Sequence, residues 1–231
     1  MIENKPSIYN GPSIYNQGGG GGGAFVPDGY KIYQILEMIN NNRFPSGEPD
    51  LGKIKIDYDD VIIFEADLKP TKPPTNPWDV NFYLRAQSTT GSSQFITAGL
   101  SCWNENYGNN YYYYNGSAEF GTAHSYPSQK IHFLTKSYKD KLIINGVTNV
   151  VARPHPSTNK FGMVLLGSGV SSEFTFYSLK VFDETETTLK QNWFPALELA
   201  TSNKGILDLI SGAFVKVQTD ADATLFAEII V

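Results

Sequence analysis

The chain has 231 residues, enough for one large domain with a sizeable core. Apolar residues make up 41% of the sequence and charged residues 18%, proportions that exclude a disordered chain and a coiled coil. The 18 basic side chains are outnumbered by 23 acidic ones and the net charge is -5, so we expect no nucleic-acid partner.

Two copies of one five-residue motif lie near the start of the chain. Pro6–Asn10 reads Pro-Ser-Ile-Tyr-Asn, Pro12–Asn16 repeats it, and six consecutive glycines follow from Gly18 to Gly23. This segment cannot form a core of its own, but its Ile-Tyr pairs suit docking in extended form on another protein. The glycines would act as a flexible tether of about 13 Å. A disordered leader without a partner is the alternative interpretation.

These features predict two regions. Residues 1–23 form an extended anchoring arm with a glycine tether, and residues 24–231 form one folded domain. The partner-binding residues predicted in the arm are Ile8, Tyr9, Ile14 and Tyr15. The first residues do not resemble a signal peptide and no run approaches 18 apolar residues, so we expect a soluble intracellular product without membrane insertion.

Short apolar stretches separated by Gly, Pro, Asn and Ser fill the chain from Ala24 onward. Alternating or β-branched segments of this length are typical of antiparallel strands. The segments predicted as strands are Ile54–Tyr58, Val61–Leu68, Val80–Ala86, Gln94–Ser101, Asn110–Tyr114, Lys130–Lys136, Lys141–Ile144, Gly162–Leu166 and Glu173–Phe182. The pattern predicts an all-β fold of two antiparallel sheets, a sandwich or jelly roll.

One segment has helical periodicity. In residues 30–39 the side chains of Ile32, Ile35, Leu36 and Ile39 share one helical face, and three asparagines follow. We therefore predict a short helix at this position.

Two connections have a defined geometry. Asn145-Gly146 lies between apolar stretches and predicts a type I′ hairpin, because both central residues of that turn need positive φ. The segment 69–77 has four prolines among nine residues, so we expect a stiff surface connection between sheets rather than a central strand.

The segment 174–214 carries a family resemblance. Phe176–Asp183 reads Phe-Tyr-Ser-Leu-Lys-Val-Phe-Asp, Asn192–Ala196 reads Asn-Trp-Phe-Pro-Ala, and Lys204–Phe214 reads Lys-Gly-Ile-Leu-Asp-Leu-Ile-Ser-Gly-Ala-Phe. Together they resemble the closing strands of the concanavalin A-like (laminin G-like) jelly rolls found in bacteriophage virion proteins. Residues 54–151 resemble that family more loosely, through strand order, and residues 1–23 lie outside the resemblance.

The resemblance implies a strand, then a turn at Phe194-Pro195-Ala196, then a hairpin over Gly205–Phe214. Asp208 lies among apolar residues in that hairpin. Its residue type predicts a structural role in the following turn, either as a buried carboxylate that caps the backbone or as a solvent-facing turn residue.

Jelly rolls of this general shape include glycoside hydrolases, whose retaining members need two carboxylates about 5 to 5.5 Å apart. Their strand reads Glu-x-Asp-x-x-Glu; Glu65 and Asp67 fill the first two places here, but Pro70 stands in the third. The sequence also has no nucleophile-elbow or phosphate-loop motif. We therefore expect no enzymatic activity and assign no catalytic residue.

Metal chemistry has little support in the sequence. Cys102 is the single cysteine, and the histidines His124, His132 and His155 have no i, i+4 spacing. The acidic clusters at Asp57–Asp60 and Asp220–Asp222 lie in turn-like contexts, where carboxylates are usually solvated rather than bound to calcium. We expect no metal and no cofactor.

Residues 103–115 combine aromatic and amide side chains. Three interpretations stay open: packing on the sheet, a protein interface, and a glycan site in which rings stack on sugars and amides bond hydroxyls. The candidate glycan or interface residues are Trp103, Tyr107, Tyr112 and Tyr114.

The arm and the resemblance together predict a non-enzymatic structural protein of a bacteriophage virion. The arm would anchor it to the capsid or tail, and the jelly roll would project outward as a head fibre, capsid decoration or tail-associated protein for host-surface adhesion. Expected partners are other virion proteins, further copies of the chain with a trimer favoured, and a host surface glycan. The expected location is the virion, assembled in the host cytoplasm. The alternative is a glycan-binding receptor-recognition module.

Overall fold

The computed structural model describes residues 26–39, 42, 44, 53–70, 80–87, 94–101, 110–114, 119–125, 130–150, 160–161, 163–166 and 172–230. The arm predicted at residues 1–23 lies outside these ranges. Within them, every regular element is a β-strand apart from short 3-10 turns, and all strand pairs are antiparallel. The prediction of an all-β protein is confirmed.

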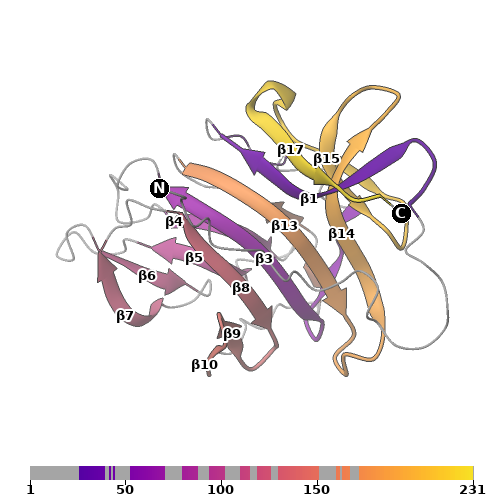
Figure 1. The fold of residues 1–231 in the computed structure, drawn as a ribbon. Helices are drawn as coiled ribbons and strands as arrows, with labels where there is room; N and C mark the ends of the chain where they lie inside the picture. The colour runs from indigo at the N-terminus through magenta and orange to yellow at the C-terminus, as the bar shows by residue number, and fades with distance from the viewer. Residues whose placement is uncertain are drawn as a thin grey trace, which may run out of the picture.

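The larger sheet has ten strands (Figure 1). In spatial order they are β10 (Val147–Asn149), β9 (Leu142–Ile144), β8 (Ile131–Ser137), β3 (Val61–Pro70), β13 (Ser172–Phe182), β1 (Tyr30–Met38), β14 (Leu189–Glu198), β15 (Lys204–Asp208) and β16 (Phe214–Lys216), with β17 (Ala223–Glu228) paired along β1.

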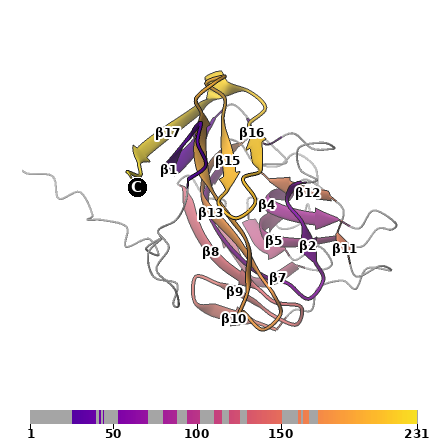
Figure 2. The same ribbon diagram turned by 90° about the vertical axis from the view of Figure 1, so that its right-hand side faces the viewer.

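A second sheet of five strands lies on one side of β3, β8 and β13 (Figure 2). Its strands, in spatial order, are β12 (Met163–Leu166), β4 (Val80–Gln87), β5 (Gln94–Ser101), β6 (Asn110–Tyr114) and β7 (Glu119–Ser125). A short pair, β2 (Ile56–Asp57) with β11 (Lys160–Phe161), completes the described strands. The two layers fit a β-sandwich.

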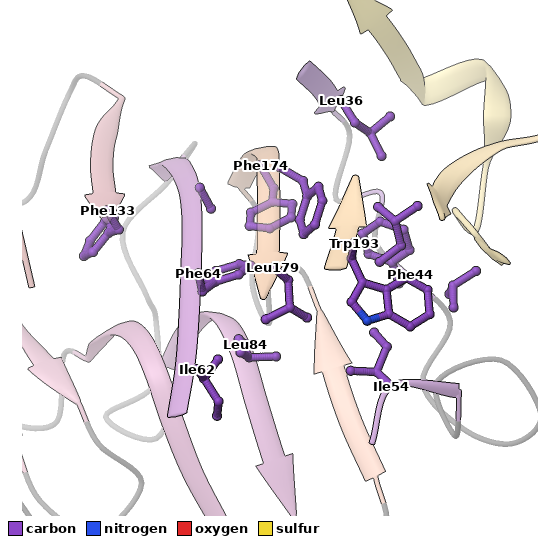
Figure 3. Packing of buried hydrophobic residues seen from close by; sticks show 14 of the residues in the cluster. Leu36, Phe44, Ile54, Ile62, Phe64, Leu84, Phe133, Phe174, Leu179 and Trp193 are labelled. Atoms are coloured by element: carbon purple, nitrogen blue, oxygen red, sulfur yellow. The ribbon is translucent and has the colours of Figure 1, made fainter. Parts of the chain in front are cut away.

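The main hydrophobic core lies between the two sheets. Along β3, the fully buried side chains are those of Ile62, Phe64, Ala66 and Leu68, which alternate with residues that face the other way. Leu84 of β4 joins the same cluster from the second sheet, and Figure 3 shows it near Ile62 and Leu179. Each fully buried Leu, Ile or Phe stabilises the fold by about 2 kcal/mol.

The helix predicted at residues 30–39 is wrong, because this segment is strand β1. Its first residues pair with β14 through Ile32 and Ala196, and its last residues pair with β13 through Leu36 and Phe176. Leu36 is buried, whereas Ile39, which the helical pattern placed on the apolar face, is 45% exposed. The residues buried in the strand are Ile32, Leu36 and Met38, which fit a two-residue period, and hydrogen bonds to neighbouring strands select the extended form.

The turn that the resemblance implied at Phe194-Pro195-Ala196 is also wrong, because these residues lie inside β14. Pro195 pairs with Ile206 of β15. On the other edge, β14 pairs with β13 up to Trp193 and with β1 from Ala196 onward. On that edge, Pro195 lies between the segment that pairs with β13 and the segment that pairs with β1, so its missing amide proton interrupts neither of these pairings.

One of the two predicted connections can be compared in full. The Asn145-Gly146 hairpin is confirmed, with φ of 49° and 83° and with Ile144 paired to Val147. β3 extends two residues beyond its predicted end, to Pro70, which pairs with Ser172, and the rest of the proline-rich segment lies outside the described residues.

The structural role predicted for Asp208 is confirmed, in its buried form. The side chain is 1% exposed and accepts hydrogen bonds from the amides of Asn192, Ile210 and Ser211 and from the Ser211 hydroxyl. One carboxylate thus joins β14, at Asn192, to the turn that leads into β16.

Gly205 provides a test of this end of the sheet. A Cβ at Gly205 would lie 2.1 Å from the Val215 carbonyl oxygen, so Gly205→Ala must displace backbone of β16. We expect a loss of about 3 kcal/mol in the free energy of unfolding, measured by urea denaturation. Gly146→Ala is the control, because its site has positive φ but open space and the strain there costs about 1 kcal/mol. Equal losses in both variants would contradict this prediction.

Candidate functional site

The face of the larger sheet that points away from the core carries a line of polar residues across its centre. His132 of β8 pairs with Asp67 of β3, Asp67 with Thr175 of β13, and Thr175 with Glu37 of β1. We call these residues the cross-strand row. They occupy the positions between core residues, since Phe133, Ala66, Phe176 and Leu36 are buried on the opposite face.

Asp67 is the hub of the row. One of its oxygens, Oδ1, lies 2.7 Å from His132 Nδ1, and the other, Oδ2, accepts a hydrogen bond of 2.6 Å from the Tyr177 hydroxyl. The Tyr177 and His132 rings meet edge to face at 5.8 Å. The carboxylate therefore links β8 to β13 through its own strand.

A β-bulge places Tyr177 in this position. The register between β3 and β13 shifts between Phe176 and Ser178, so that Tyr177 is the extra residue. A bulge changes the direction of a side chain without breaking the strand. Burial, followed by the hydrogen bond to Asp67, holds the pKa of the Tyr177 hydroxyl well above its usual range, which keeps it a neutral donor.

Glu65 is the second carboxylate near His132. It lies two residues before Asp67 on the same strand, and its Oε1 is 3.4 Å from His132 Nε2. The hydrogen bond that His132 donates to Asp67, and then the one it donates to Glu65, raise the pKa of His132 to about 9. The imidazole is thus a cation at neutral pH that donates from both nitrogens, even though 45% of the side chain is exposed.

At the other end of the cross-strand row, Lys130 contacts both Glu37 and Thr175. Its Nζ lies 2.7 Å from Glu37 Oε1 and donates to Thr175 Oγ1 at 3.2 Å. Both charged side chains are more than a third exposed, so this ion pair adds little to stability. It does fix the positions of a cation and an anion on the open face of the sheet.

Two carboxylates on this face occupy the first two places of the hydrolase pattern. Glu65 and Asp67 both pair with His132, at 3.4 Å and 2.7 Å. The backbone of Pro70 lies in the same strand, at the place where the hydrolase pattern has an acid. The charged groups and the Tyr177 phenol hold one another in fixed positions on this face.

The structure describes only part of the site predicted from the sequence. Ile8, Tyr9, Ile14 and Tyr15 of the arm, and Trp103 and Tyr107, lie outside the described residues. Tyr112 and Tyr114 lie on β6, where Tyr112 pairs with Ser101 and Tyr114 with Glu119.

Sequence reasoning missed the link between Asp67, His132 and Tyr177. A signal for half of it was present, because Glu65 and Asp67 alternate with core residues, and so does His132 between Ile131 and Phe133. The pairing of β3 with β8 and the bulge at Tyr177 are long-range features that no local pattern encodes.

Within the described part of the chain, no group of three His, Cys, Asp or Glu side chains is placed to hold a metal ion. A search of the same residues finds no helix with the length and apolar character to cross a membrane. No family model matches the chain, and a search of curated proteins finds no relative.

The pKa of His132 gives a pH test. Because folding raises this pKa from 6.5 to about 9, the native state holds the proton more tightly than the unfolded chain. The stabilisation is complete below pH 6.5 and is lost as the pH rises through 9. Solvent screening of the half-exposed ring reduces it to about 1 kcal/mol.

We therefore expect the free energy of unfolding to fall by about 1 kcal/mol more in the wild type than in His132→Gln between about pH 6 and pH 9.5. Urea denaturation at the two pH values measures the change in the free energy of unfolding for each protein. An equal change in the two proteins would show that His132 does not hold its proton more tightly in the folded state.

Proposed function

We propose that this chain is a non-enzymatic structural protein of a bacteriophage virion. Its arm anchors it to a capsid or tail protein, and its β-domain is displayed outward for adhesion to the host surface. The proposal includes a concanavalin A-like jelly roll for residues 24–231 and self-association into a homo-oligomer, with a trimer favoured.

The observation that carries the proposal is that an anchoring sequence precedes a folded β-domain in one chain. The repeated Ile-Tyr motif and the glycine tether precede a domain with an extensive core of its own. A tether raises the effective concentration of a displayed module at its site of attachment without adding contacts.

The resemblance in residues 174–214 supports the finer fold. These residues form β13, β14, β15 and the start of β16, which lie in one antiparallel sheet. The hairpin implied by the resemblance is formed by β15 and β16. Buried Asp208 holds the turn between them, which gives the family-like Asp-Leu-x-Ser-Gly sequence a physical reason.

Deletion of residues 1–23 tests attachment. We expect the truncated protein to be missing from purified particles, with at least a tenfold lower copy number by quantitative mass spectrometry, because the tethered docking contacts are removed. Thermal unfolding of the truncated protein should match that of the full chain.

A paired set of point variants separates docking from tether length. Tyr9→Ala with Tyr15→Ala should lower incorporation, whereas Asn10→Ala with Asn16→Ala serves as the matched control in the same repeats. Full occupancy of particles by the deletion variant would reject the arm as an anchor.

A glycan-binding receptor-recognition module is the second candidate. The aromatic and amide residues from 103 to 115 favour it, since rings stack on sugar faces and amides bond hydroxyls. In that case Trp103→Ala and Tyr112→Ala should each lose signal on a glycan array that the wild-type chain binds. Tyr138→Ala is the control, because Tyr138 lies beyond β8 and bonds Glu186. A wild-type chain that binds no glycan on the array would count against this candidate.

A further inference from the structure

A lysine and an asparagine lie directly opposite each other on β13 and β14. Lys180 of β13 is the register partner of Asn192 of β14. The neighbouring pair, Leu179 with Trp193, is buried in the core (Figure 3), so the Lys180 and Asn192 side chains share the opposite face. Directly opposed residues on antiparallel strands have Cβ atoms about 5 Å apart. The flexible four-carbon stem of lysine can therefore bring its Nζ to the Asn192 amide.

A buried carboxylate lies on the other side of Lys180. In the register between β3 and β13, Lys180 is opposite Ile63, which makes Glu65, two residues further along β3, its diagonal neighbour. Diagonal neighbours lie about 7 to 8 Å apart, within reach of two long side chains. The charge of Glu65 acts on Lys180 at this separation. The register thus places a carboxylate, an amine and an amide next to one another on three adjacent strands.

Lys180 and Asn192 both carry covered polar atoms without partners. Lys180 is 7% exposed, and among the described residues no hydrogen bond or ion pair reaches its ammonium group. Asn192 Oδ1 is buried and has no hydrogen-bond partner in the same part of the chain. Most buried polar groups in proteins are paired, because leaving them unpaired is costly. Two such groups on directly opposed residues point to a common cause.

We propose that Lys180 and Asn192 condense into an isopeptide bond between Lys180 Nζ and Asn192 Cγ, with the loss of ammonia. The bond converts the covered charge of the lysine into a neutral amide. Burial lowers the pKa of Lys180, which favours the neutral amine that attacks the amide carbon. The low exposure of Lys180 and Glu65 keeps water away from the reacting groups.

Glu65 carries the protons of this reaction. Its carboxylate takes one proton from the Lys180 ammonium group, and the resulting amine forms the new bond to Asn192 Cγ. Glu65 then gives this proton to Asn192 Nδ2 while the Cγ–Nδ2 bond breaks, so the nitrogen leaves as ammonia. The second proton of the attacking nitrogen passes through Glu65 to the ammonia, which departs as ammonium. Glu65 ends as a carboxylate, and no oxidant or further reactant is needed.

The bond fastens β13 to β14 close to the point where the two strands separate. β13 and β14 pair with each other up to Trp193. Beyond that point β1 lies between them, paired with β14 at Ala196 and with β13 at Phe176. A covalent link beside this fork prevents the two strands from separating further. The inference depends neither on the arm nor on residues 103–115, so the particle experiment and this one can fail separately.

Mass spectrometry of the full-length protein tests the bond. We expect the intact mass of most chains to be lower than the sequence mass by one molecule of ammonia. Trypsin does not cleave after an acylated lysine, so the digest should contain residues 161–190 joined to residues 191–204 as one branched peptide. Fragmentation of this peptide should place the link at Lys180 and Asn192.

Lys180→Met and Asn192→Leu should each abolish the loss of ammonia, because each removes one reacting group. Both variants should fold, since each replaces a covered polar group by an apolar one of similar size, and circular dichroism checks this. Lys69→Met is the matched control and should keep the loss of ammonia, because Lys69 lies on β3 and pairs with Glu173 at 3.0 Å.

Glu65→Gln tests the proton carrier. It keeps the size of the side chain but removes the carboxylate, so we expect the bond to form at least tenfold more slowly. The fraction of joined chains, followed by intact mass after synthesis in a cell-free system, measures this rate. A purely structural role of Glu65 would change the circular dichroism spectrum and not the rate in folded chains.

The proposal is wrong if the folded wild-type chain keeps its full sequence mass. It is also wrong if the loss of ammonia persists in Lys180→Met, because the loss would then come from another asparagine, such as Asn145 by ring closure onto the amide of Gly146. Equal rates of bond formation in Glu65→Gln and the wild type would overturn the role of Glu65.

Discussion

The arrangement of this protein depends on the two-residue alternation of β3. One set of its side chains, from Ile62 to Leu68, fills the core between the sheets, and the other set presents Glu65 and Asp67 on the open face. A shift of one residue against β8 or β13 would turn both carboxylates into the core and turn Phe64 out of it. The hydrophobic core therefore fixes where the polar face can lie.

The bulge at Tyr177 adapts β13 to this constraint. It returns Phe174 and Phe176 to the core on one side of the irregularity and Leu179 and Val181 on the other. It also divides the open face into two parts. On one side, the cross-strand row is internally paired through Asp67. On the other side, the buried Oδ1 of Asn192 has no hydrogen-bond partner among the described residues.

Local patterns predicted the strands well and the site poorly. β5 and β6 have their predicted bounds, and the Asn145-Gly146 hairpin follows from turn chemistry alone. The sequence predicts a helix for β1 because four of its apolar residues have helical spacing, whereas pairing with β13, β14 and β17 makes it a strand. Asp67, His132 and Tyr177 lie far apart in the sequence, so their contact depends on strand order and on a bulge, which composition and spacing do not encode.

The insertion of β1 between β13 and β14 has a consequence for how the chain reaches its final form. Among the described strands, β1 pairs only with β13, β14 and β17, which lie in about the last quarter of the chain. Contacts of such high sequence separation slow folding, because the entropy cost of closing a long loop comes before the strands can pair. During synthesis, β1 therefore cannot pair until its partner strands have emerged from the ribosome, and the centre of the larger sheet forms late.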